Sequence, residues 1–287
     1  SMKVLPFKIP KVESSSVHLQ IDDEPYFYDK LHQHPELQLT WIVKGEGTVI
    51  YGDYLGEFRP DEMYLIGSNV PHVFRSKAEY YLPNSSGILS KSVFFKPELI
   101  TRARVLYPET TVLNDLLDKA DRGLRFQVPH NRKAIEILLE VFQAKPLARL
   151  GHLLVLLSEL QSNEAEMLSV LPQKSIKESQ GRRLDDVFNF TLDNYHRAIQ
   201  LEEVAEVVYM NKAAFCRYFK QHTRKTYINF LNEIRLQKAT ELLKNSELNI
   251  AQIAFEVGFN NLSNFNRTFK MYRKQTPFEY RARIRVD

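Results

Sequence analysis

The chain has 287 residues, of which 44% are hydrophobic, enough to bury a core in each of two domains. Its single cysteine, Cys216, excludes an internal disulfide, and no apolar run approaches the ~20 residues of a membrane-spanning helix. The net charge of +4 is unevenly distributed: residues 182–287 hold 18 Lys/Arg and 12 Asp/Glu, whereas residues 1–181 hold 21 and 23. With no secretory signal evident, we expect a cytoplasmic protein whose basic C-terminal part binds a polyanion.

Short strands separated by turns are predicted in the first hundred residues. In the segment 37–43 (LQLTWIV), Leu37, Leu39, Trp41 and Val43 share one face of a strand. Half of the ten glycines fall within residues 45–67, where they mark turns. Further strands are expected at 48–51, 63–66, 73–74, 88–89 and 93–95. The pattern is typical of a small β-sandwich or barrel.

The hydrophobic period changes to that of helices after Pro97. Helices are predicted at 98–106, 111–120, 131–142 and 147–161. The last of these has leucines on most sides, which indicates either a core helix or a homodimer seam; we favour packing against the β domain together with dimerisation. Residues 162–183 lose this periodicity and have linker composition.

The C-terminal part reads as helical, and Asn249–Arg281 has the pattern of a helix, a tight turn and a second helix. Asn249 and Gln252 form a capping-box pattern, and Gly258 lies where the turn needs a positive φ. Phe265 and Phe269 anchor the second helix. Taken alone, this segment is equally well explained by an ordinary amphipathic helix pair with a solvated polar face.

A second copy of the pattern precedes the first by about fifty residues. Arg217-Tyr218-Phe219-Lys220 corresponds to Arg267-Thr268-Phe269-Lys270, and Val204-Ala205 corresponds to Ile253-Ala254. A helix over 231–244 would hold the two copies at a fixed separation. Two recognition helices about one duplex turn apart (~34 Å) can enter successive major-groove segments on one face of DNA.

With these residues the sequence resembles the AraC/XylS family of bacterial transcription regulators. The carrying pattern is Ile253-Ala254, Val257-Gly258-Phe259, Phe265, Arg267, Phe269-Lys270, Pro277 and Tyr280-Arg281. The segment from His32 to Phe74 resembles the cupin-type effector domain that many such regulators carry. The resemblance implies an α+β multidomain protein, with an N-terminal cupin-like β-barrel and helical extension and a C-terminal all-α domain with two helix-turn-helix motifs.

The expected organisation has four parts. An effector-binding β domain spans 1–97, a helical, dimerising extension 98–165, a linker 166–183 and the DNA-binding domain 184–287. The expected partners are double-stranded promoter DNA, a small-molecule effector and a second copy of the chain; RNA polymerase is a further partner that the resemblance allows, and no membrane is expected.

Short polar and basic side chains on the second helix of each pair are the candidates for DNA contact. Lysine and arginine suit phosphates, whereas amides and small side chains suit base edges and thymine methyl groups. The alternatives are a solvated surface charge for each lysine, an intradomain ion pair for Arg217 and Arg267, and a redox role for Cys216. The candidates are Asn211, Lys212, Ala213, Cys216, Arg217, Lys220, Arg224, Asn261, Ser263, Asn264, Asn266, Arg267, Lys270, Arg273 and Lys274.

The sequence departs from the family at three turn positions. Arg224 and Lys274 stand where members usually have glycine after each recognition helix, and Tyr209 stands where the second copy has Gly258. A left-handed conformation at a non-glycine residue costs ~1–2 kcal/mol. We therefore expect the second copy to read bases more strongly than the first.

Three histidines lie where the cupin pattern places metal ligands, with Gln38 in place of the usual carboxylate. One interpretation is a metal-dependent cupin enzyme, of the dioxygenase or isomerase class, fused to a DNA-binding domain. The other, which the missing carboxylate favours, is a metal-free pocket for a small polar effector such as a sugar. Histidines that only complete the barrel rim are a third alternative. We expect no catalytic residue, metal or cofactor; the candidate effector-binding residues are His32, His34, Gln38, Trp41, Tyr64 and His72.

Overall fold

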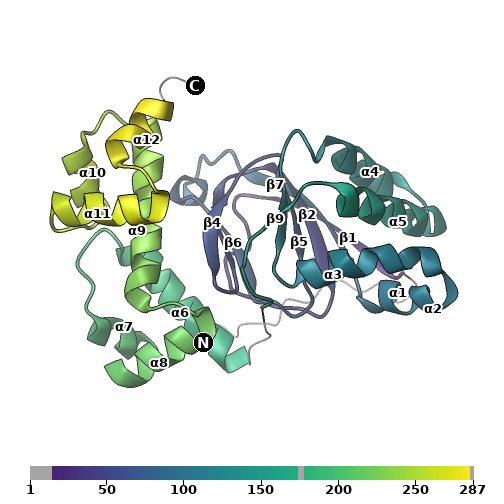
Figure 1. Cartoon of the computed structure of the whole chain (residues 1–287), viewed down its shortest axis with the longest axis horizontal. Helices are drawn as coiled ribbons and strands as arrows, with labels where there is room; N and C mark the ends of the chain where they lie inside the picture. Colours follow the sequence, from purple (N-terminus) through teal and green to yellow (C-terminus); the bar gives the residue numbers. More distant parts are fainter. Residues whose placement is uncertain (1–14, 174–177, 285–287) are drawn as a thin grey trace. The chain divides into compact units, whose positions relative to one another are not determined.

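A computed structural model describes residues 15–173 and 178–284 (Figure 1). The chain divides into two compact units, 1–177 and 178–287. Within the described residues, no helix combines the length and the apolarity needed to cross a membrane.

The first unit contains the strands. They are β1 (Val17–Glu24), β2 (Leu37–Lys44), β3 (Gly47–Tyr51), β4 (Tyr54–Phe58), β5 (Met63–Ile66), β6 (His72–Ser76), β7 (Ile88–Phe95), β8 (Leu124–Phe126) and β9 (Glu166–Met167). They form an antiparallel sheet of order β1-β7-β2-β5-β8-β9 and a smaller one of order β4-β3-β6. An isolated bridge pairs His32 with His72, the first residue of β6. The β-rich unit is therefore as expected, whereas the expected closed barrel is not formed: the strands make two sheets.

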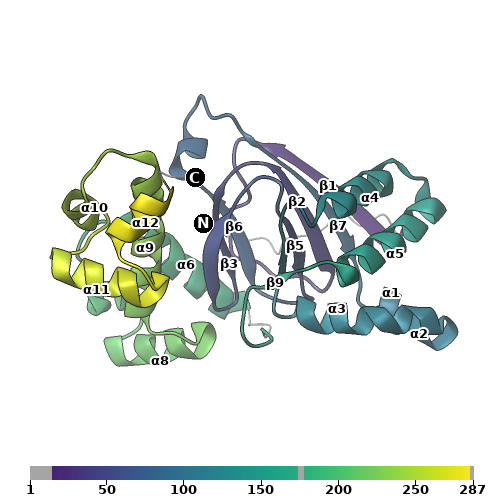
Figure 2. The ribbon, with the colours of Figure 1, turned by 45° about the horizontal axis from the view of Figure 1, so that its top comes forward.

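The helices of the first unit cover one face of the larger sheet (Figures 1 and 2). They are α1 (Glu98–Thr101), α2 (Ala103–Leu106), α3 (Leu113–Ala120), α4 (Arg132–Gln143) and α5 (Pro146–Ser162), with 3-10 turns η1 (Ala78–Tyr81) and η2 (Pro108–Val112). The helical layer packs on strand residues such as Leu39 and Val93 through side chains such as Leu138 and Leu157, all fully buried. The outer side of α5 leaves Leu147 84% exposed and Val155 54% exposed.

Strand β2 is buried on both faces because it lies between two cores. Leu37 and Leu39 face the helical layer, whereas Ile42 packs with side chains of the smaller sheet such as Phe58 and Phe74. The predicted alternation is thus confirmed. It also places Gln38 and Thr40, polar residues of the Ile42 face, in the buried space between the sheets.

The second unit is helical throughout. Its elements are α6 (Glu178–Asn194), α7 (Leu201–Val207), α8 (Lys212–Thr223), α9 (Tyr227–Asn245), α10 (Ile250–Glu256), α11 (Leu262–Arg273) and α12 (Pro277–Ile284). Both α6 and β9 include residues of the stretch expected to be a linker. Leu184, Val187 and Phe188 anchor α6 in the core, and β9 pairs with β8. The 19-residue α9 is about 28 Å long. It contacts α8 as well as α10 and α11.

The two helix pairs, α7–α8 and α10–α11, are built by the same local rules. Asn211 and Asn261 cap α8 and α11, each accepting a hydrogen bond from the backbone N–H three residues on. The turn residues Tyr209 and Gly258 have φ of 57° and 94°. A Cβ at position 258 would collide with the carbonyl oxygen of Tyr195, so glycine is needed there for space as well as for conformation.

Both recognition-type helices end on a left-handed residue that is not glycine. Arg224 after α8 has φ 59° and Lys274 after α11 has φ 60°. The strain expected from the sequence at these positions is therefore present in the fold.

Replacing Lys274 with glycine should raise the stability of the helical unit by about 1 kcal/mol, because glycine adopts the left-handed conformation without strain. Lys270→Gly on the same helix is the matched control, and it should lower stability by about 1 kcal/mol because Lys270 lies within α11. Calorimetric unfolding of the full chain measures both. Destabilisation by both substitutions would contradict the assigned strain.

Candidate functional site

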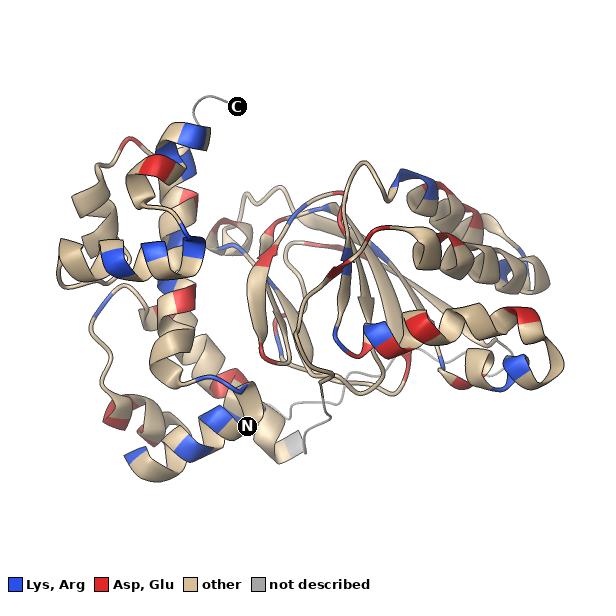
Figure 3. Ribbon diagram, in the orientation of Figure 1, with Lys and Arg blue, Asp and Glu red and all other residues tan. Residues whose placement is uncertain are grey.

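Helix α11 presents a polar and basic face opposite a buried aromatic one. Phe265, Thr268 and Phe269 are buried, whereas Arg267 and Lys270 on the other side are exposed. Three- and four-residue spacing places Ser263, Arg267, Lys270 and Lys274 in one row along the helix. Blue segments on α11 in Figure 3 mark the Lys and Arg residues of this helix.

Helix α8 carries an equivalent row. Phe215 and Phe219 are buried, and Arg217, Lys220 and Arg224 are exposed fifty positions before their counterparts in α11. The cations thus repeat between the two helices, whereas Ala213 and Cys216 replace Ser263 and Asn266. Repeated cations suit a repeated phosphate backbone, and differing side chains between them suit different bases.

All fifteen candidate DNA-contacting residues lie at the surface of the helical unit. Asn264 and Asn266 are half-buried, and the other thirteen are exposed. The side-chain oxygens of Asn211 and Asn261 act as helix caps, and the –NH2 group of Asn261 donates to Asn260 Oδ1 at 3.1 Å.

Lys212 and Arg267 are among the candidates that make contacts within the unit. Lys212 forms an exposed ion pair with Glu202 at 2.9 Å, and Arg267 Nη2 donates to Asn264 Oδ1 at 3.1 Å. An exposed ion pair contributes little stability, so Lys212 can exchange Glu202 for a phosphate at little cost. The contact between Asn264 and Arg267 orients both side chains on the same face of α11.

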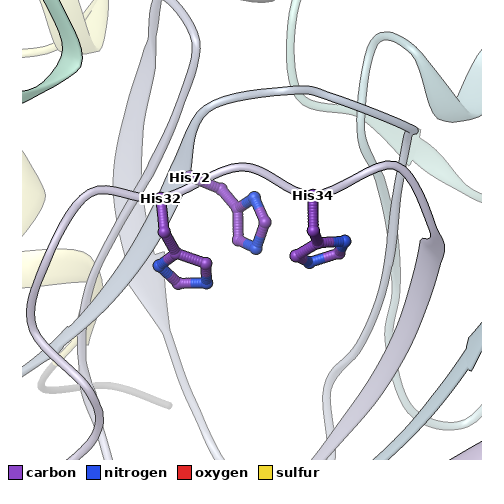
Figure 4. A group of neighbouring side chains, drawn as sticks. All are labelled: His32, His34 and His72. Atoms are coloured by element: carbon purple, nitrogen blue, oxygen red, sulfur yellow. The ribbon is translucent and has the colours of Figure 1, made fainter. Parts of the chain in front are cut away.

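In the first unit, the structure brings His32, His34, His72 and Gln38 together (Figure 4). His34 and His72 are 4% and 1% exposed. The Nε2 atoms of His34 and His72 lie 3.0 and 3.2 Å from Gln38 Oε1, and the Gln38 amide donates to Thr40 Oγ1 at 2.7 Å. A contact of 2.8 Å between the hydroxyls of Thr40 and Ser92 extends this buried polar network onto β7.

Burial keeps the three imidazoles neutral near pH 7. Desolvation lowers the pKa of His32 to about 4 and lowers the pKa values of His34 and His72 as well. A neutral imidazole with one nitrogen protonated presents a lone pair on the other nitrogen, which can accept a hydrogen bond or coordinate a metal.

Trp41 and Tyr64 do not complete this cluster. The structure places Trp41 against the helical layer, on the face of β2 opposite Gln38, so the expectation that it lines the same pocket is wrong. Tyr64 lies between the sheets, where its hydroxyl donates to Glu62 Oε2 at 2.5 Å. Burial, reinforced by Glu62, raises the pKa of Tyr64, which therefore remains protonated.

Comparisons with known proteins find similarity to transcription regulators that have a helix-turn-helix domain. A family model described as a helix-turn-helix domain matches residues 204–283. Two uncharacterised HTH-type transcriptional regulators of Bacillus subtilis are similar: YdeC, 31% identical over 34% of this chain and 34% of that protein, and YfiF, 24% identical over 88% and 78%. The transcriptional activator RhaR of Mannheimia succiniciproducens is 23% identical over 88% of this chain and 87% of that protein.

Residues 204–283 form an AraC-type helix-turn-helix domain. The chain spans only about a third of the length of the first curated relatives it matches, 34% and 35%.

One exposed side chain of the helical unit was not among the predicted DNA-contacting residues. Tyr209 lies on the turn immediately before α8 and is 97% exposed. Its φ of 57° puts this non-glycine residue in the left-handed region. Mapping onto Gly258 identified it only as a less suitable turn residue.

Proposed function

We propose that the chain is a transcription regulator of the AraC/XylS family in which both helix pairs are helix-turn-helix units that bind promoter DNA. The repeated row of exposed cations on α8 and α11 is the observation that carries the proposal. Its residues Arg217, Lys220 and Arg224 in one helix and Arg267, Lys270 and Lys274 in the other are the phosphate-positioning set.

Base reading is assigned to the positions that differ between the two helices. Ser263, Asn264 and Asn266 carry hydroxyl and amide groups able to pair with base edges, whereas Ala213 and Cys216 offer only small contacts. The second helix pair, α10–α11, therefore supplies more of the sequence specificity. Its turn, with Gly258, also holds α11 without the strain that Tyr209 brings to the pair α7–α8.

The first unit is proposed as the effector-responsive part. The buried polar cluster of His32, His34, Gln38 and His72 supports a cupin-like ligand-binding role, and the exposed Leu147 and Val155 on α5 support homodimer formation. Ligand binding would act by shifting the population of states that present the helical unit to DNA.

Arg267→Ala should weaken DNA binding by roughly 5- to 150-fold, equivalent to about 1–3 kcal/mol, and Arg217→Ala should weaken it less. Arg104→Ala, an exposed charge-matched change on α2, serves as the control and should leave affinity unchanged. Fluorescence anisotropy with a DNA fragment selected from a random pool by the full chain measures all three. Equal affinities for Arg267→Ala and the parent protein would contradict the recognition-helix assignment.

Lys270→Ala should reduce the slope of log affinity against log salt concentration by about 1, because one phosphate contact and its released counterions are lost. Ser263→Ala on the same helix should leave the slope unchanged and relax the preference for one base. Titrations at several salt concentrations separate the two effects. An unchanged slope for Lys270→Ala would remove Lys270 from the phosphate-contacting set.

A further inference from the structure

Three histidines come together in the β-rich unit: His32 and His34 from the segment before β2, and His72 from the start of β6. One ligand atom from each of His32, His34 and His72 can be chosen so that all lie within 4.8 Å of one another, and their rings converge in Figure 4. The backbone holds this arrangement in place: His32 N donates to His72 O at 3.1 Å, and His72 N donates to His32 O at 2.9 Å. The segment before β2 is thereby fixed against the start of β6.

The three imidazoles share one hydrogen-bonding arrangement. Each Nδ1 lies at a main-chain carbonyl oxygen, that of Lys30 at 2.7 Å for His32, of Glu36 at 3.0 Å for His34 and of Val70 at 2.8 Å for His72. A carbonyl oxygen only accepts, so Nδ1 carries the proton and Nε2 carries a lone pair. Metal-binding histidines are oriented in this way, with the non-coordinating N–H donating to a carbonyl or carboxylate.

Gln38 presents oxygen to these lone pairs. Its –NH2 donates to Thr40, which turns Oε1 toward the Nε2 atoms of His34 and His72 at 3.0 and 3.2 Å. Acceptors that face one another at this distance repel, and a cation between them reverses the sign of the interaction. Ligand bonds of roughly 2.1 Å at right angles separate neighbouring donor atoms by about 3.0 Å, which matches these spacings.

The donor set selects the class of cation. Imidazole nitrogen suits Zn²⁺, Ni²⁺, Cu²⁺ and Fe²⁺, whereas Mg²⁺ and Ca²⁺ require oxygen ligands. The carboxylate of Glu36, 3% exposed, has Oε2 3.9 Å from His34 Nδ1 and offsets part of the positive charge. Because His34 and His72 are almost fully buried and His34 packs edge-on against Phe94 at 5.4 Å, the site suits an ion better than a sugar.

We propose that His32, His34, His72 and Gln38 bind one divalent transition-metal ion, and that this ion is the effector that controls DNA binding. This inference rests on the proposed function and replaces the metal-free sugar pocket expected from the sequence. The ion ties the segment before β2 to the start of β6, and so favours the state of the unit in which these segments are joined.

Metal binding is tested with the full chain, free of any affinity tag and stripped by a chelator. Calorimetric titration with ZnCl2 and with NiCl2 should show one ion per chain. His72→Ala should lower the affinity by more than the roughly 10- to 100-fold that loss of an outer-shell partner costs. His130→Ala, an exposed histidine of the same unit, is the control and should bind as the parent does. Absence of stoichiometric binding in the parent protein would overturn the site.

A second variant protects the test against misfolding. Gln38→Glu supplies a charged oxygen at the same position and should raise the affinity by at least about tenfold, since a carboxylate attracts a divalent ion more strongly than an amide does. If Gln38 is instead only a hydrogen-bonded hub for the imidazoles, Gln38→Glu gains no metal affinity, and that result would overturn its role as a ligand. Thermal melting of each variant reports whether the fold is retained.

The effector role is tested by anisotropy with the selected DNA, with and without ZnCl2 or NiCl2. The ion should change DNA affinity of the parent by at least about fivefold and leave His72→Ala unaffected. Metal binding with unchanged DNA affinity would overturn the effector role while leaving DNA binding intact. A chain that binds metal but no DNA under either condition would overturn the proposed function and the effector role with it, and would leave the metal site standing.

Discussion

The paired aromatic residues under α8 and α11 are the constraint on which the proposed DNA-binding face depends. Phe265 and Phe269 in α11, with ring centroids 5.7 Å apart, are fully buried, as are Phe215 and Phe219 in α8 at the same spacing and distance. A helix that buries positions four apart exposes the opposite side, which includes the residue two positions after the first aromatic, Arg267 in α11 and Arg217 in α8. The exposed cations therefore follow from the core beneath them, and loss of an aromatic anchor would turn the whole row.

The same core explains why strained turns persist. Tyr209, Arg224 and Lys274 all hold left-handed conformations that glycine would adopt more easily. Strain of about 1–2 kcal/mol at each position is retained where surrounding packing dictates the backbone. Arg224 and Lys274 accept this strain and place a positive charge at the end of α8 and α11. Each charge extends the proposed phosphate-binding row by one residue. At Gly258, contact with the Tyr195 carbonyl leaves no room for any side chain.

Much of the helical unit was predictable from sequence because one pattern occurs twice in it, so that each copy supports the interpretation of the other. The β-rich unit contains no such repeat, and less of its structure was predictable. Alternation in β2 was correctly predicted, yet a strand buried on both faces gives no sign of which face meets which core, so Trp41 was grouped with the wrong partners. Strands β4 and β8 are short and lack strong alternation, and β1 ends in charged residues. The start of α6 looks like a linker because its first turns are polar; the apolar anchors begin only at Leu184.

The polar face of β2 links fold to ligand binding. Gln38 and Thr40 occupy positions where an apolar side chain would complete the core between the sheets, and burying an amide and a hydroxyl there is unfavourable unless each is satisfied. The Gln38 –NH2 group donates to Thr40 and the Thr40 hydroxyl contacts that of Ser92, whereas the Gln38 oxygen faces the lone pairs of His34 and His72. A purely structural core needs none of these groups, since apolar residues of similar volume would pack without the desolvation cost. Their concentration beside the bridge between His32 and His72, where two segments of the unit meet, is the arrangement expected of a site whose stability depends on what it binds.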